Sequence, residues 1–185
     1  MKHPEESAAD SALRTPHSAL AIIALGSNLG DSQVILRSAM VRLESFSAQP
    51  LLKSSLWQTS PVDCPPGSPK FLNAVIAMVP QPEETPETLL EKLQALEKEF
   101  GRRPKTILNE PRPLDLDLIA FGGETRESSR LTLPHPRATE RHFVLQPLSE
   151  IAANLVLPGQ AKTVAQLLAA LSDAETCEKV DGPQT

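Results

Sequence analysis

Apolar and polar residues follow a regular pattern through the first part of the chain. Residues 21–25 form a short run of Ala, Ile and Leu that ends at Gly26, which predicts a strand followed by a turn. From Leu36 to Phe46 the apolar residues recur at spacings of three and four, as they do along one face of an amphipathic helix. The chain is therefore expected to open with a strand and a helix whose apolar face packs on a sheet.

The following elements continue this alternation. Residues 51–57 and 71–79 predict two strands, separated by a proline-rich stretch that predicts a loop. A second helix is expected to begin after Thr85, whose hydroxyl can cap it, and to end at Gly101. Residues 114–121 predict a fourth strand. This order of elements predicts an α+β fold with a ferredoxin-like βαββαβ core, an antiparallel-rich sheet and helices on one face.

The remaining residues predict a C-terminal extension and two tails around a single domain. Residues 151–157 are expected to add an edge strand, and residues 163–171 a short closing helix. We expect a disordered N-terminal tail over residues 1–18, one domain over residues 19–172 and a C-terminal tail over residues 173–185. The predicted domain has an ordinary size for a single core.

Composition narrows the range of partners. The chain has 185 residues and a formal net charge of -5, which argues against general nucleic-acid binding because such binding requires a surplus of Lys and Arg. The longest apolar run, residues 19–25, is too short to cross a membrane, which takes about 20 apolar residues. Cys64 and Cys177 are too few and too far apart for a disulfide framework or a zinc site. We therefore expect a monomeric cytoplasmic protein with free thiols that binds neither nucleic acid nor membranes.

The run R-P-L-D-L-D-L, residues 112–118, carries the first candidate chemistry. In a strand its leucines face the core, and Asp115 and Asp117 project together from the opposite face. Alone, this pattern is more typical of a solvated strand face than of a metal site. A basic stretch, residues 102–112, leads directly into it. Carboxylates beside cationic side chains are typical of a nucleotide triphosphate site with Mg²⁺, and the chain has no P-loop motif.

Six motifs in a fixed order resemble those of one enzyme family. They are A-L-G-S-N-L-G (24–30), F-L-N-A (71–74), G-R-R (101–103), P-R-P-L-D-L-D-L (111–118), L-P-H-P (133–136) and F-V-L-Q-P-L-S-E-I (143–151). The set is similar to hydroxymethyldihydropterin pyrophosphokinase. The resemblance implies transfer of the β,γ-pyrophosphate of ATP to 6-hydroxymethyl-7,8-dihydropterin in folate biosynthesis, which yields the pterin diphosphate and AMP.

The resemblance also implies roles for individual residues around the phosphates. Asp115 and Asp117 would bind two Mg²⁺ ions that bridge the phosphates of the co-substrate ATP. Arg102 and Arg112 would complete the catalytic set, because guanidinium groups match phosphate oxygens. No residue is assigned as a general base. The residues expected to bind ATP are Gln94, Glu97, Arg102, Arg112, Arg130, Thr132, His135 and Arg141.

For the pterin, the resemblance implies an aromatic slot. Phe71 and Phe143 would sandwich the flat ring, and the amide of Asn73 would both donate to and accept from its polar edge. Such a slot accounts for a preference for a bicyclic heterocycle. The residues expected to complete the pterin site are Thr59, Ser60 and Val62.

Two alternatives to an active enzyme follow from the same residues. Asn109 stands where the family has a tryptophan that caps the pterin, and Glu110 adds a negative charge beside it. These departures leave open a non-catalytic or weakly active descendant that binds nucleotide or pterin on the same scaffold. The other alternative is an unrelated ferredoxin-like interaction module in which the two aspartates form a solvated face.

Overall fold

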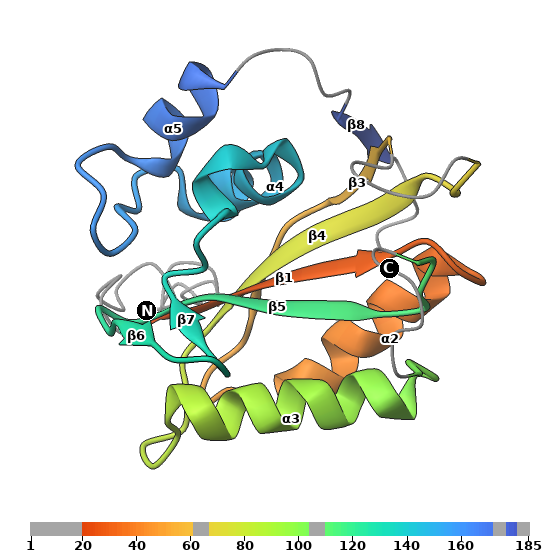
Figure 1. Cartoon of the computed structure of the whole chain (residues 1–185), viewed down its shortest axis with the longest axis horizontal. Coiled ribbons are helices and arrows are strands. Elements are labelled where there is room, and N and C mark those ends of the chain that lie inside the picture. Colours follow the sequence, from red (N-terminus) through yellow and green to blue (C-terminus); the bar gives the residue numbers. More distant parts are fainter. Residues whose placement is uncertain (1–19, 61–66, 104–109, 172–176, 181–185) are drawn as a thin grey trace, which may run out of the picture.

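An antiparallel sheet forms the centre of the molecule, with helices on both of its faces (Figure 1). The computed structural model describes residues 20–60, 67–103, 110–171 and 177–180. The strand order is β5-β1-β4-β3-β8, and β2 pairs with β4 beside β3. The expected α+β ferredoxin-like core is thereby confirmed. The strands are β1 (Ala21–Ser27), β2 (Leu52–Lys53), β3 (Leu56–Thr59), β4 (Phe71–Met78), β5 (Asp115–Phe121) and β8 (Cys177–Val180).

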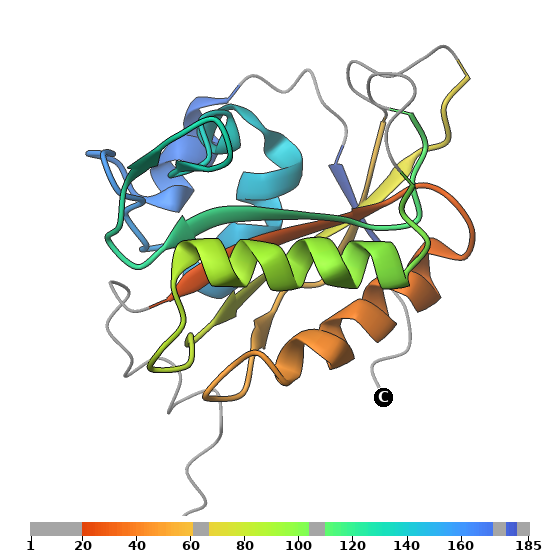
Figure 2. The ribbon, with the colours of Figure 1, turned by 60° about the horizontal axis from the view of Figure 1, so that its bottom comes forward.

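Helices cover both faces of the sheet. The core helices α2 (Ser32–Glu44) and α3 (Pro86–Glu99) pack on one face, and α4 (His142–Ala152) packs on the other, with α5 (Val164–Ala170) against α4 (Figures 1 and 2). Each face has its own cluster of buried apolar side chains. The second cluster joins side chains of β1, β4 and β5 to those of the C-terminal extension, so this extension makes the sheet a buried middle layer.

Local sequence signals set the N-terminal starts of the two core helices. Asp31 caps α2 by accepting a hydrogen bond from the Val34 backbone N–H at 3.1 Å. At the start of α3, Thr85 immediately before Pro86 and Thr88 in the first turn form a reciprocal capping box. A capping side chain satisfies a backbone N–H that has no partner inside the helix. The start of α3 therefore agrees with the sequence prediction.

The strand predicted over residues 51–57 is in fact two short strands, β2 and β3. Ser54 lies between them, and its hydroxyl accepts a hydrogen bond from the Val75 N–H at 2.9 Å. Its own N–H donates to the Val75 carbonyl at 3.0 Å. The Ser54 hydroxyl thus takes the place of a backbone carbonyl as the acceptor for the Val75 N–H. β4 therefore stays hydrogen-bonded where β2 ends and β3 has not yet begun.

The edge strand predicted over residues 151–157 was wrong. These residues continue and follow α4, in which Val144, Leu148 and Ala152 are buried at four-residue spacing, so helical periodicity prevails. The edge of the sheet is formed instead by β8, which pairs with β3 in the register Leu56↔Val180. The predicted C-terminal tail over residues 173–185 thus contains a strand of the sheet.

The segment between β5 and α4 carries a small hairpin. It consists of β6 (Arg126–Glu127) and β7 (Thr132–Leu133), followed by the short 3-10 helix η2 (Ala138–Glu140). This segment leads the chain from one edge of the sheet to the start of α4. Within the described residues, no helix is long and apolar enough to cross a membrane.

Candidate active site

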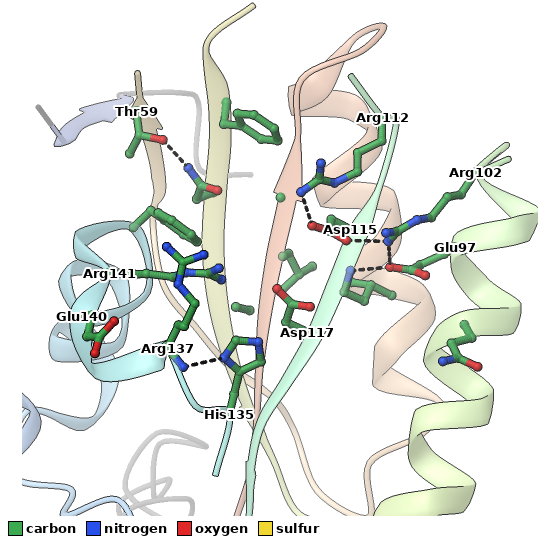
Figure 3. A pocket seen from close by; sticks show the side chains of 18 of the residues that line it. Thr59, Glu97, Arg102, Arg112, Asp115, Asp117, His135, Arg137, Glu140 and Arg141 are labelled. Carbon is green, nitrogen blue, oxygen red and sulfur yellow. Dashed lines mark hydrogen bonds and ion pairs between the residues drawn. The ribbon is translucent and has the colours of Figure 1, made fainter. Parts of the chain in front are cut away.

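A cavity of about 420 Å³ lies at the β5 edge of the sheet and is lined from α3 on one side to the start of α4 on the other. Its floor is the end of β1 and the beginnings of β4 and β5, which the antiparallel register brings side by side: Gly26 pairs with Asn73 on one side and with Asp115 on the other. Figure 3 shows the two strand aspartates between two groups of basic residues. On one side are Arg102 and Arg112, and on the other are His135, Arg137 and Arg141.

The strand β5 places its two aspartates as the alternation of L-D-L-D-L predicts. Leu116 and Leu118 are 5% and 3% exposed and belong to the core beneath the sheet. Asp115 and Asp117 line the cavity on the opposite face. The period of two residues in a strand therefore produces a pair of neighbouring carboxylates in one cavity.

Asp115 is held by two arginines. Arg112 Nη2 and Arg102 Nη1 each lie 2.5 Å from a different carboxylate oxygen of Asp115. Burial raises the pKa of Asp115, but the charges and hydrogen bonds of Arg112 and Arg102 outweigh it and hold the pKa below its usual value. Asp115 is thus a carboxylate at neutral pH, and both arginines are engaged with it.

Glu97 extends this network from α3. It contacts Arg102 and accepts a hydrogen bond from the Leu116 N–H at 2.7 Å. Burial raises the pKa of Glu97 to about 7, with a further contribution from Asp115 and Asp117, while the Leu116 hydrogen bond and Arg102 oppose the shift. Glu97 lines the cavity, but its side chain is committed to orienting Arg102 and the start of β5.

Asp117 lies in the opposite electrostatic situation. Burial raises its pKa, and the neighbouring charge of Asp115 raises it further. His135, Arg141 and Arg112 oppose this shift only in part. A second buried carboxylate beside the first favours binding of a hard cation, because a cation removes the repulsion between the two.

Arg112 has a hydrogen-bond donor that its pairing with Asp115 does not use. Its backbone N–H donates to Asn28 Oδ1 at 2.9 Å, and its carbonyl accepts from the Asn28 N–H at 3.2 Å, so the G-S-N-L-G turn anchors the residue. Its Nε is buried and has no hydrogen-bond partner among the described residues. Such a donor is costly unless something accepts from it, and a ligand oxygen would do so.

The opposite wall is aromatic with one buried amide. Asn73 Nδ2 donates to Thr59 Oγ1 at 2.8 Å, which fixes the direction of the amide. Arg112 lies over the ring of Phe71 with 5.3 Å to its centroid, and Arg141 lies over Phe143 at 5.2 Å. The arginines and rings thus form continuous walls from the phosphate side to the aromatic side.

The structure brings most of the predicted site residues to this cavity. Arg130 does not line it and is paired with Glu91 on the surface at 2.9 Å. Thr132 is exposed on β7 and does not line it either, and Val62 lies outside the described residues. The predicted residues that line the cavity are Thr59, Ser60, Phe71, Asn73, Gln94, Glu97, Arg102, Arg112, Asp115, Asp117, His135, Arg141 and Phe143.

Two charged residues of the cavity were missed by the sequence analysis. Arg137 and Glu140 line it from the segment that precedes α4. The Arg137 N–H donates to His135 Nδ1 at 3.3 Å. After burial, the charge of Arg137 is the largest contribution that lowers the pKa of Arg141. The i,i+4 spacing of Arg137 and Arg141 was a signal that could have indicated a shared cationic patch.

Comparisons with known proteins agree with this geometry. The family model of 7,8-dihydro-6-hydroxymethylpterin-pyrophosphokinase (HPPK) matches residues 22–153. The 2-amino-4-hydroxy-6-hydroxymethyldihydropteridine pyrophosphokinase of Bacillus subtilis is 41% identical over 133 residues, which cover 71% of this chain and 77% of the relative. The enzyme of the same name from Synechocystis is 37% identical over 148 residues, which cover 80% and 74%.

Solved structures show the same fold. A crystal structure of an HPPK-DHPS in complex with substrates is similar with a TM-score of 0.65 and 12% identity, over 82% of this chain. The chain spans 43% of the length of that solved protein. The family model covers most of the chain and includes β1, β4, β5 and the start of α4, which build the cavity. The chain therefore belongs to the 7,8-dihydro-6-hydroxymethylpterin-pyrophosphokinase family.

Proposed function

We propose that this chain is an active pyrophosphokinase, which transfers the β,γ-pyrophosphate of ATP to the hydroxymethyl group of 6-hydroxymethyl-7,8-dihydropterin and releases AMP. One observation carries the proposal. A single cavity joins two strand carboxylates and two arginines to a pair of phenylalanines with a buried amide between them. The first group suits a polyphosphate and the second a flat heterocycle.

Asp115 and Asp117 are the proposed ligands of two Mg²⁺ ions. Their residue types fit, because Mg²⁺ binds through one or two carboxylates and takes its other ligands from phosphates and water. Among the described residues no three His, Cys, Asp or Glu side chains cluster to form a complete protein cage. Bound Mg²⁺ would supply orientation of the phosphates and compensation of their charge.

Arg102 and Arg112 are the proposed catalytic cations. Both contact Asp115, and the Nε of Arg112 has no partner among the described residues. Arg112 and Arg102 can exchange Asp115 for phosphate oxygens when ATP binds, and their planar donor groups suit the charge that develops during phosphoryl transfer. Gln94, His135 and Arg141 line the remaining part of the proposed nucleotide site.

The pterin is proposed to lie between Phe71 and Phe143, with its polar edge toward Asn73. The Thr59 hydroxyl holds one amide hydrogen of Asn73, which would leave the other amide hydrogen and the oxygen for the pterin. The reaction then depends on holding the hydroxyl of the substrate in line with the β-phosphorus. We assign no general base.

The departure from the family at Asn109 does not favour a non-catalytic chain. Residues 104–109 lie outside the described residues, while the walls on either side are complete. Within the proposal, Asn109 would weaken pterin capping without affecting the carboxylates.

A monomer in the cytoplasm is part of the same proposal, and size-exclusion chromatography tests the oligomeric state.

The decisive experiment is an assay of the nucleotide product. Purified protein with Mg²⁺, ATP and 6-hydroxymethyl-7,8-dihydropterin should form AMP and no ADP, and omission of the pterin or addition of EDTA should abolish the product. Asp117→Asn is the matched control, because it replaces one proposed metal ligand by a side chain of the same shape. Formation of ADP, or AMP at the level of a boiled sample, would refute the proposed function.

A further inference from the structure

Glu150, in the last turn of α4, lies outside the set of residues that line the cavity. Its carboxylate accepts hydrogen bonds from Ser55, just before β3, and from Trp57 on β3. Its Oε2 accepts from the Ser55 N–H at 2.8 Å and from Trp57 Nε1 at 3.1 Å, and Lys179 of β8 lies 2.8 Å from its Oε1. Glu150 therefore connects α4, β3 and β8.

These connections lead directly to the aromatic wall. Phe143 precedes Glu150 by seven residues, which places both on the same face of α4. Trp57 pairs with Asn73 in the register of β3 and β4, and Thr59 follows on the same face of β3. One carboxylate thus ties the helix that carries Phe143 to the strand whose Thr59 orients Asn73.

We infer that Glu150 is a positioning residue for the pterin, which sets the separation of Phe143 from the sheet through its hydrogen bonds to Ser55 and Trp57. This inference rests on the proposed function. β8 supports the same contact from the edge of the sheet, where Lys179 holds the second oxygen of Glu150. The strand lies beyond residues 22–153, the part of the chain that the family model matches.

The type of contact supports a positioning role. The apolar side chains of α4 that pack on the sheet, such as Val144 and Leu148, supply attraction without direction. The indole and backbone N–H groups instead fix a distance and an angle for the helix. The bonds from Lys179, Ser55 and Trp57 outweigh burial and lower the pKa of Glu150, so the acceptor is charged at neutral pH.

The ATP side of the cavity has separate supports. Arg102 is held by Glu97 of α3, Arg112 by the turn at Asn28, and Asp115 by its place on β5. None of these contacts involves Glu150, Trp57 or β8. A change at Glu150 is therefore expected to affect the pterin more than the nucleotide, whereas a general loss of stability would affect both ligands.

Binding measured separately for the two ligands tests the inference. For Glu150→Ala, calorimetry should show pterin binding, in the presence of Mg²⁺ and α,β-methylene-ATP, weakened by about tenfold, the loss of one good interaction. Binding of the nucleotide analogue alone should change by less than about twofold. Glu150→Gln should restore most of the pterin affinity, because its amide oxygen can accept from Ser55 and Trp57. Equal weakening of both ligands, or no weakening of either, would overturn the inference.

Two further variants keep the test informative if Glu150→Ala does not fold. Trp57→Phe keeps the ring but removes the indole donor, and should weaken the pterin selectively by a smaller factor. Glu44→Ala is the matched control, since it removes a surface glutamate that is paired with Lys53 and does not line the cavity, and should leave both affinities unchanged. Absence of AMP in the wild type would refute the proposed function, whereas normal AMP formation with an unaltered Glu150→Ala would refute the positioning role alone.

Discussion

The two walls of the cavity differ in how their side chains are held. In the acid–arginine wall, formed by Glu97, Arg102, Arg112, Asp115 and Asp117, the first four residues form ion pairs with one another. In the aromatic wall, formed by Thr59, Phe71, Asn73 and Phe143, the rings and one oriented amide face the cavity without any such internal neutralisation. The first wall must exchange partners when a ligand arrives, whereas the second is already arranged.

This difference indicates where each wall is vulnerable. An ion-pair network in a partly buried site is stable only as a set, because removal of one charge leaves another uncompensated. Stacking and a single amide depend instead on distances of a few tenths of an ångström. We therefore expect substitutions among the paired residues of the acid–arginine wall to change activity and stability together, and those in the aromatic wall to change affinity for one ligand.

The largest effect is expected for Asp117→Asn, which should lower the rate of AMP formation by about 10²–10³-fold, as removal of one charge-stabilising group typically does. Its stability should not fall. Burial and Asp115 raise the pKa of Asp117, so its charge opposes folding at neutral pH and an amide removes this cost. AMP release and the thermal unfolding midpoint measure the two effects, and a marked loss of stability would contradict the assignment.

Asp115→Asn is the informative partner of that variant. Arg112 and Arg102 hold the pKa of Asp115 below its ordinary 3.8 despite burial, so the carboxylate stabilises the folded state above that pH. Its replacement should therefore lower both the rate and the unfolding midpoint. Similar unfolding midpoints for the two asparagine variants would show that the charges of Asp115 and Asp117 do not have opposite effects on stability.

Glu97 should make the stability of the wild type fall as the pH rises. Burial raises its folded pKa from 4.5 to about 7, so between these values the folded state holds a proton that the unfolded state has lost. Stability is then greatest below 4.5 and decreases up to about 7. Glu97→Gln should remove about 2–4 kcal/mol of this dependence. Thermal unfolding across the interval tests it, and identical pH profiles for the two proteins would contradict it.

A smaller effect is expected in the aromatic wall for Phe71→Leu. The variant keeps apolar bulk but loses the ring, so the KM for the pterin should rise about tenfold, near the upper end of what stacking contributes. The KM for ATP should change less, because Arg112 loses its contact with the ring but keeps those with Asp115 and Asn28. Steady-state kinetics with each substrate varied in turn measure both values. A larger change in the KM for ATP than for the pterin would refute the division into two walls.

The smallest effect is expected for Gly26→Ala, at the floor between the walls. A Cβ there would lie 3.3 Å from Asn73 Oδ1 but 3.8 Å from the Asp115 Cβ. The first contact is tight and the second is ordinary, so Asn73 should be displaced and Asp115 should not. Pterin affinity should fall about threefold, in the range of an off-rotamer side chain. Calorimetry with each ligand tests this, and selective weakening of the nucleotide would contradict it.

Most of the fold could be predicted because its signals are local. The alternation of L-D-L-D-L placed Asp115 and Asp117 on one face, and Thr85 with Pro86 marked the start of α3, as the structure confirms. The edge strand was mispredicted because its first residues belong to α4, whose buried side chains recur at helical spacing. Pairing of Cys177–Val180 with β3 depends on a partner more than a hundred residues away, which no local pattern reports.

The sequence by itself determined that two carboxylates share a strand face, that a basic stretch precedes them, and which family the ordered motifs resemble. The tertiary structure decided the partners. It alone joined Arg102 to Glu97 and Asp115, placed Arg137 at the cavity and Arg130 outside it, and brought Glu150 to Trp57 across 93 residues. The reason is physical: strand and helix periodicities are properties of neighbouring residues, whereas pKa shifts and positioning contacts depend on groups that only folding brings together.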